Sequence, residues 1–384
     1  MNTKNRILET FIVEKYKDRI GRSKEKLTKA FNLVKVDEFP VIIRTRPYYL
    51  TGTNPKKIPD DYFENPKTMT EYQAEGLIEH MEQINDDTIP YLMPWLGTGV
   101  IPSAFGSKIK FGYKSDPAVC SRAINDIKDI ARIKVPDFES DGLMPRVLEF
   151  INYMKDNDYG IPVSITDTQS PLDSIGLMCG HENLYYWIAD DPGAVKHLFE
   201  IVTETLILWT KKQKEILGLE KDEVNGLQDV WTPKGVGVWI SEDDDMMTSP
   251  KIWEEFVKEP VERILNEFGS GFLHFCGNPR NLIDNYSKLK GLSGFNNWIM
   301  GNIDNAVYVK KNLCKNKCLM ICDFTPVDIG GYYNAIIDNF DPTGIIILAE
   351  NTEELAANNG GSVATKRDRF ESAKRIMEVF NNRK

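Results

Sequence analysis

The feature that most constrains this fold is an alternation of short apolar runs with longer amphipathic segments, which begins near Ile89. Seven of these runs predict buried strands at residues 90–94, 161–166, 235–240, 271–275, 292–296, 318–322 and 344–348. Parallel strands joined by crossover helices produce this pattern, in a closed barrel or an open sheet. No GxGxxG or GxxxxGK[ST] sequence marks nucleotide binding at a helix start. We therefore predict an α/β fold, a single (β/α)8 TIM barrel, with one strand not located.

Capping signals mark some of the intervening helices. Asp191 followed by Pro192 predicts a helix start, and Gly218 predicts the end of that helix. Residues 249–250 give the same start signal for a second helix, which Pro260 should kink or interrupt. We expect the apolar faces of these helices to belong to the core.

The first part of the chain differs in pattern from the rest. Residues 1–85 carry apolar positions at helical spacing, such as Leu77, Ile78 and Met81, together with irregular segments. We expect an N-terminal helical extension over 1–85, packed on a barrel that spans 86–384.

Charge and cysteine content exclude several functions. The net charge of -10 comes without a basic run broad enough to neutralise a row of phosphates, which argues against nucleic-acid binding. No apolar stretch approaches the roughly 20 residues that cross a bilayer, and the first residues are charged throughout. We expect a cytoplasmic protein with no membrane partner. The six cysteines are scattered, which indicates free thiols or metal thiolates rather than a disulfide framework.

The segment 271–278, GFLHFCGN, is the most informative stretch for chemistry. Alternate side chains of a strand share a face, so His274 and Cys276 should point the same way near the strand's carboxyl end. Catalytic residues of barrels collect at this end, and an imidazole beside a thiolate suits zinc. The pair predicts half of a zinc site. The alternative is a structural histidine beside a small buried cysteine.

Zinc needs at least one further ligand from the protein. Cys322, at the end of the predicted strand 318–322, is one candidate. Glu350, just after the predicted strand 344–348, is another.

Two acidic segments also follow predicted strands. Asp167 is a candidate for binding substrate or moving protons, with a turn or cap aspartate as the alternative. Asp245, in the acidic run 242–245, is a second candidate, although most of that run should face solvent.

Several ordered motifs carry a family resemblance from about residue 70 to the C-terminus. They are IPYLMPWLGTG at 89–99, QSPLDS at 169–174 with DDP at 190–192, WISEDDDMMTSP at 239–250 with EEF at 254–256, and HFCGN at 274–278. Together they resemble the uroporphyrinogen decarboxylase superfamily, which includes the cobalamin-dependent methyltransferases. The resemblance implies one (β/α)8 barrel with its pocket at the carboxyl ends of the strands.

The His-x-Cys element resembles the zinc site of the methyltransferase branch, in which His274 and Cys276 would be metal ligands. In that branch the metal lowers the pKa of a thiol substrate, which makes the thiol a better methyl acceptor. That branch usually adds a cysteine after the last strand, whereas this chain has LAENT at 348–352. Either Cys322 or Glu350 completes the site, or the metal chemistry differs.

The resemblance leads to three hypotheses. The first is a zinc-dependent methyltransferase that moves a methyl group between a small methylated compound or thiol acceptor and a corrinoid (cobalamin) cofactor. A partner protein would carry the corrinoid, because the chain lacks an Asp-x-His-x-x-Gly sequence. The second is a metal-free decarboxylase or lyase that uses His274 and Asp167. The third is a catalytically silent corrinoid- or tetrapyrrole-binding component. The methyl donor or acceptor, the direction of transfer and any homodimer stay open.

Overall fold

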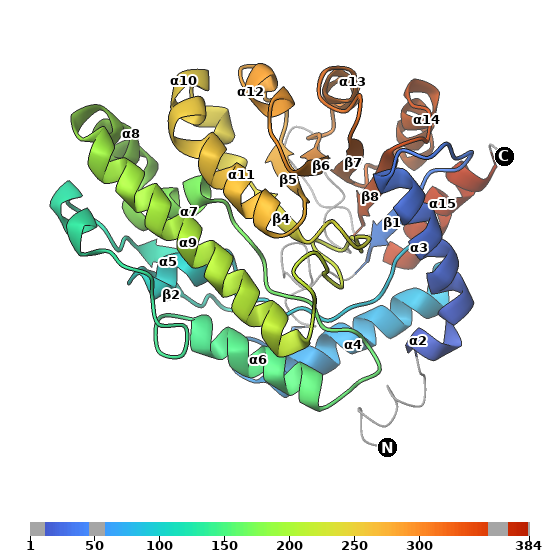
Figure 1. Cartoon of the computed structure of the whole chain (residues 1–384). Coiled ribbons are helices and arrows are strands. Elements are labelled where there is room, and N and C mark those ends of the chain that lie inside the picture. Colours follow the sequence, from blue (N-terminus) through green and yellow to red (C-terminus); the bar gives the residue numbers. More distant parts are fainter. Residues whose placement is uncertain (1–11, 46–57, 352–367, 383–384) are drawn as a thin grey trace.

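A parallel sheet forms the centre of the molecule, and helices surround it (Figure 1). The computed structural model describes residues 12–45, 58–351 and 368–382. The sheet has the order β1-β8-β7-β6-β5-β4, and every neighbouring pair is parallel. Its strands are β1 (Val41–Arg44), β4 (Val238–Ser241), β5 (Gly271–Cys276), β6 (Leu292–Trp298), β7 (Cys318–Phe324) and β8 (Ile345–Glu350).

Two irregular segments fill the remaining positions of the barrel. Leu92 and Val163 form one parallel bridge, and Gln169 forms another with Ser241 at the end of β4. These segments correspond to the predicted strands 90–94 and 161–166. Prolines at 90, 94 and 162 lack the N–H that a continuous strand ladder requires, so the pairing is reduced to single bridges. The six strands and these two segments together give eight strand positions around the barrel, and helices connect them. The predicted (β/α)8 barrel is therefore confirmed.

The strand that the sequence pattern did not locate is β1. It pairs in parallel with β8, from Val41 opposite Ile347 to Arg44 opposite Glu350. On its other side, side-chain carboxylates at 86–87 accept the backbone N–H groups of Val41 and Ile43 at 2.9 and 2.8 Å. Part of the segment 1–85 is therefore built into the barrel sheet. The division of the chain at residue 85 stays a prediction.

The helices form the outer layer. The principal ones are α3 (Lys17–Phe31), α4 (Pro66–Gln83), α6 (Met144–Asp156), α7 (Pro171–Cys179), α8 (His181–Asp190), α9 (Pro192–Leu217), α11 (Lys258–Glu267), α13 (Ile303–Asn312), α14 (Ile329–Asn339) and α15 (Arg369–Asn381). Shorter elements are α2 (Ile12–Lys15), α5 (Val100–Ala104), η2 (Ile127–Arg132), η3 (Asp243–Met247), α10 (Pro250–Ile252), η4 (Trp253–Val257) and α12 (Ile283–Ser287), with a hairpin of β2 (Lys108–Lys110) and β3 (Ala118–Ser121).

The predicted capping signals appear in these helices. Asp191 caps α9 by accepting the N–H of Ala194, and Gly218 ends it in the left-handed conformation at φ 69°. The helix that begins at Pro250 continues from α10 through the π-helical turn η4 into α11. Pro260 has no N–H to donate one turn back, and the wider turn ahead of it accommodates this loss. Pro260 thus distorts the helix without ending it.

The structure also bears on membrane-spanning helices and on the state of the cysteines. No helix in the described part of the chain is both long and apolar enough to span a membrane. The six cysteines are free thiols.

Candidate functional site

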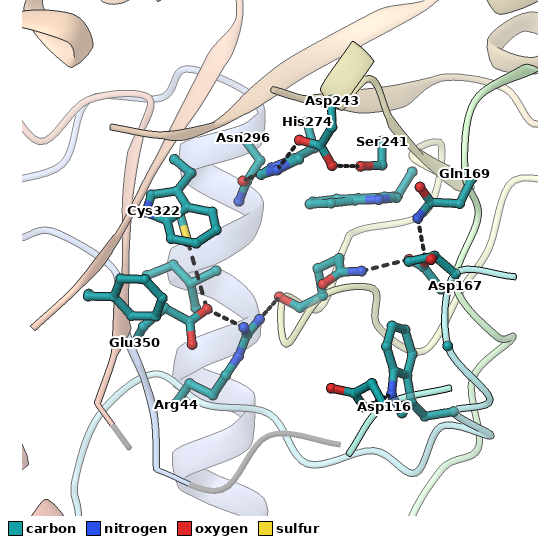
Figure 2. Close-up of a pocket in the computed structure, with 18 of the residues that line it drawn as sticks. Arg44, Asp116, Asp167, Gln169, Ser241, Asp243, His274, Asn296, Cys322 and Glu350 are labelled. Carbon is teal, nitrogen blue, oxygen red and sulfur yellow. Dashed lines mark hydrogen bonds and ion pairs between the residues drawn. The ribbon is translucent and has the colours of Figure 1, made fainter. Parts of the chain in front are cut away.

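A cavity of about 350 Å³ lies at the carboxyl ends of the barrel strands (Figure 2). Its wall includes Arg44, Trp95, Asp116, Asp167, Gln169, Gln228, Trp239, Asp243, His274, Asn296, Trp298, Cys322 and Glu350. These residues come from strand ends and the loops that follow them, which is where barrel enzymes place their active sites.

Three ligand atoms converge at one side of this cavity. Among the described residues, Asp243, His274 and Cys276 form a group that could hold a metal ion, because their ligand atoms lie within 4.8 Å of one another. Cys276 Sγ donates to Asp243 Oδ1 at 3.1 Å and lies 3.7 Å from His274 Nε2. His274 Nε2 lies 3.3 Å from the same carboxylate oxygen. The structure therefore brings the pair on β5 together and adds Asp243 as the third donor.

The His274 ring is fixed by two neighbours. Its Nδ1 donates to Oδ1 of Asn296, on the adjacent strand β6, at 2.7 Å. Trp239 stacks on the ring, with centroids 5.2 Å apart and planes 18° apart. With one proton held at Nδ1, a neutral His274 would have its Nε2 lone pair available to a metal between Asp243 and Cys276, which is the arrangement a metal-binding histidine needs.

The charges of the three donors depend on one another. Burial lowers the pKa of His274, but the hydrogen bond and charge of Asp243 outweigh burial and raise that pKa overall. Burial likewise acts to raise the pKa of Asp243, but His274 brings it down to about 2. Burial, followed by the negative charge of Asp243, raises the pKa of the Cys276 thiol. Without a metal, Asp243 is thus ionised and Cys276 is protonated.

Hydrogen bonds join the segment η3, which carries Asp243, to helix α7. The buried carboxylate of Asp173, in the first turn of α7, accepts the backbone N–H groups of Asp243 at 3.0 Å and Asp244 at 3.1 Å. His181 Nε2 bonds to Asp244 Oδ2 at 2.5 Å. A Cβ on Gly176 would lie 2.6 Å from both of these atoms, so the close approach requires glycine.

Cys322 and Glu350 belong to a second group in the cavity wall. Cys322 Sγ donates to Glu350 Oε1 at 3.9 Å, and the same oxygen forms an ion pair with Arg44 Nη1. Burial raises the pKa of Glu350 to about 7, although Arg44 opposes this shift. Burial also raises the pKa of the Cys322 thiol. The predicted third ligands therefore lie together, but outside the group formed by Asp243, His274 and Cys276.

Asp167 lines the cavity and is held by amides. Gln169 Nε2 donates to its Oδ2 at 2.5 Å, and Gln228 Nε2 donates to its Oδ1 at 2.6 Å (Figure 2). Burial raises its pKa despite these hydrogen bonds. Asp245 lies in η3, but its side chain falls outside the described part of the structure.

Sequence reasoning missed three residues of this site. Asp243 is one of four consecutive acidic residues, and the folded η3 loop is what selects it. Arg44 lies in the segment interpreted as an extension. Asn296 left a signal, because a pair of asparagines at 296–297 is unusual in a predicted buried strand.

Comparison with known proteins places the chain in a family. The uroporphyrinogen decarboxylase (URO-D) family model matches residues 22–216, just over half of the chain, so the chain belongs to this family. The matched span includes Arg44 and Asp167 and ends before β4.

Solved structures share the fold. One that matches is a methyltransferase from Methanosarcina mazei, with 17% sequence identity and a TM-score of 0.67. The match covers 94% of this chain and 98% of the other chain. At this identity the likeness concerns the fold. No curated protein sequence matches the chain significantly.

The chemistry of the three donors Asp243, His274 and Cys276 suits a metal ion. Imidazole nitrogen, thiolate sulfur and carboxylate oxygen are the three ligand types that zinc takes in proteins. Here one of each converges, and the other nitrogen of the histidine is occupied by Asn296. The three residues therefore fit a zinc ion with a position left for substrate, as in catalytic zinc sites.

Proposed function

We propose that this chain is a zinc-dependent methyltransferase that moves a methyl group between a small methylated compound or thiol acceptor and a corrinoid cofactor on a partner protein. The observation that carries the proposal is the convergence of Asp243, His274 and Cys276 beside the strand-end cavity, whose wall includes Asp243 and His274. Membership of the URO-D family and the fold shared with the Methanosarcina mazei methyltransferase support it. We also expect a cytoplasmic location.

The protein's own residues have separable roles in this proposal. His274 Nε2, Cys276 Sγ and Asp243 Oδ1 would hold zinc, while Asn296 and Trp239 keep the histidine ring in place. Bound zinc would supply Lewis-acid activation of the heteroatom that gains or loses the methyl group.

Asp167 is the residue we expect to handle a proton. Burial raises the pKa of this carboxyl, which makes it a better proton acceptor than an exposed aspartate. We propose that it exchanges a proton with the substrate heteroatom. Asp245 keeps its predicted role as an alternative proton-handling residue.

Methyl transfer to or from a free corrinoid tests the proposal. We expect the zinc-loaded protein to transfer methyl groups from free methylcobalamin to thiols, which releases cob(I)alamin, or from methylated compounds to cob(I)alamin kept reduced by an added chemical reductant, which forms methylcobalamin. The absorbance of the cobalamin follows both directions. Asp167→Asn should lower the rate by about 10²–10⁴-fold while zinc stays bound. Zinc-loaded protein that neither demethylates methylcobalamin with any thiol nor methylates cob(I)alamin with any methylated compound would contradict corrinoid-dependent transfer. The metal-free decarboxylase, which the family description favours, would then become the leading candidate.

A further inference from the structure

A tight turn enters the cavity between two of its walls. Leu227 and Val230 exchange backbone hydrogen bonds of 2.9 Å in each direction, which closes a two-residue turn that we call the cavity turn. The residues at its tip are Gln228, with φ 48°, and Asp229, with φ 63°. Left-handed conformations at two successive residues other than glycine are strained, and such strain concentrates at functional sites.

The cavity turn engages Arg44, the one arginine among the described residues that line the cavity. Arg44 Nε forms an ion pair with Asp229, and Arg44 Nη2 donates to the backbone carbonyl of Gln228 at 3.2 Å. Arg44 Nη1 forms an ion pair with Glu350 on β8. Among the described residues, Arg44 therefore has two acidic partners and one backbone acceptor.

The same turn also reaches the opposite wall. The side-chain amide of Gln228 donates to Asp167 Oδ1 at 2.6 Å, and the backbone N–H of Asp229 donates to Tyr91 Oη at 2.6 Å. A continuous set of contacts thus runs from Glu350 through Arg44 and the cavity turn to Asp167 (Figure 2).

The rest of the described cavity wall carries further carboxyl groups and indole rings among neutral side chains. Asp116, Asp167 and Asp243 add carboxyl groups, and tryptophans line it at positions 95, 239 and 298. An anionic ligand would meet these carboxyl groups and would have to compete with Asp229 and Glu350 for Arg44. Placing like charges together at an interface is unfavourable, so such a ligand is disfavoured. Flat apolar groups suit the indole rings.

We propose that the cavity turn makes this site select methylated compounds that carry no negative charge, by keeping Arg44 neutralised through Asp229. This inference rests on the proposed function for the identity of the methylated ligand. The substrates of the cavity would then be uncharged methyl compounds with a flat apolar body. Carboxylates, sulfonates and phosphates would be excluded.

A pair of methyl ethers that differ in charge tests this selectivity. We would measure binding of 4-methoxyphenol, neutral near pH 7.5, and 4-methoxybenzoate, anionic at that pH, by isothermal titration. The wild-type protein should bind 4-methoxybenzoate at least about tenfold more weakly than 4-methoxyphenol. Asp229→Asn keeps the side-chain shape but leaves Arg44 partly uncompensated. It should raise the affinity for 4-methoxybenzoate about tenfold or more, with little change for 4-methoxyphenol.

Asp323→Asn is the matched control. Asp323 is a buried carboxylate at the end of β7, and it accepts from Tyr332 Oη at 2.5 Å and from the backbone of Gly301 at 2.8 Å. Its loss should leave the ratio of the two affinities unchanged. Should Asp229→Asn fail to fold, Glu350→Gln removes the other acidic partner of Arg44 and carries the same expectation.

Two outcomes would overturn the inference. One is a wild-type protein that binds 4-methoxybenzoate as tightly as 4-methoxyphenol. The other is a folded variant that gains no affinity for the anion. Titrating protein with and without zinc separates this result from the proposed function. Discrimination in a chain that binds no zinc would sink the zinc mechanism alone, and loss of discrimination in a zinc-loaded chain would sink the selectivity alone.

Discussion

His274 and Cys276 lie two residues apart on β5, so both side chains leave the same face of the strand, and Asp243 reaches them from the loop that follows β4. Across the cavity, Arg44, Glu350 and Asp229 form a buried ion cluster of a different kind. One group combines nitrogen, sulfur and oxygen donors around a common point, and the other combines a cation with two carboxyl groups. The group of Asp243, His274 and Cys276 suits a metal ion, and the two carboxyl groups beside Arg44 offset the positive charge of its side chain.

The pKa of Glu350 predicts a pH dependence of stability. Burial raises this pKa from 4.5 to about 7, so between these values the folded chain binds more protons than the unfolded chain. The stabilisation from the protonated group is therefore complete below pH 4.5 and is lost as the pH rises through 7. Relative to Glu350→Gln, which mimics the protonated form, the wild-type free energy of unfolding should fall by about 1–3 kcal/mol between pH 5 and 8. Urea unfolding of both proteins measures this. A difference that stays constant, or that grows in favour of the wild type, would contradict the prediction.

Strand alternation was enough to predict the pair His274 and Cys276 from the sequence. The third donor could not be predicted, because residues 242–245 offer four acidic side chains and only the folded η3 loop distinguishes them. Cys322 and Glu350 do line the cavity, as their places at strand ends suggested. The contact of Glu350 with Arg44 depends on the pairing of β1 with β8, which joins residues about three hundred positions apart in sequence.

At the scale of elements, the geometry of the candidate metal site depends on how η3 is held. Asp173 of α7 accepts two backbone N–H groups from this loop, one with each of its carboxylate oxygens. Ser241, the last residue of β4, donates to Asp243 Oδ2 at 2.9 Å. The position of the third donor is therefore set by a helix and a strand together.

Weakening this anchor should weaken metal binding. Asp173→Asn replaces one accepting oxygen with an amide that donates, so one of the two η3 backbone groups loses its acceptor. We expect zinc affinity to fall about 10–100-fold, as measured by competition with a chelator. When cobalt(II) replaces zinc, the ligand-field absorption bands of Asp173→Asn should differ from those of the wild type. A loss of stability alone would not change these bands.

Asp191→Ala serves as the control for this experiment. It removes the cap of α9 and should cost about 1 kcal/mol in the free energy of unfolding without changing zinc affinity. Equal zinc affinities in Asp173→Asn and the wild type would show that η3 does not depend on this anchor.

Element prediction succeeded where local signals were strong. The caps of α9 and the apolar runs of β5 to β8 are local features, and each appears in the structure. The predicted strands at 90–94 and 161–166 became single bridges, because prolines remove backbone donors there. β1 is only four residues long, and its burial on all four positions gives no alternation to detect.

At the scale of the whole molecule, the barrel brings distant segments to one cavity. Arg44 comes from the first strand of the sheet, Asp167 from the irregular segment near the opposite edge, and Glu350 from the last strand. The family model covers the first half of this arrangement, and the candidate metal ligands lie in the second half. The barrel thus combines a family scaffold with a donor set that indicates what kind of chemistry the cavity performs.

The most direct test of this account is the zinc content of the purified protein by elemental analysis, with His274→Ala, Cys276→Ala and Cys322→Ala variants. We predict about one zinc per chain in the wild type, loss of zinc in the His274 and Cys276 variants, and retention in the Cys322 variant. Melting temperatures of the same samples show that each chain is folded. A folded wild-type chain that binds no zinc after reconstitution, or one whose zinc survives both the His274 and Cys276 substitutions, would contradict the central claim.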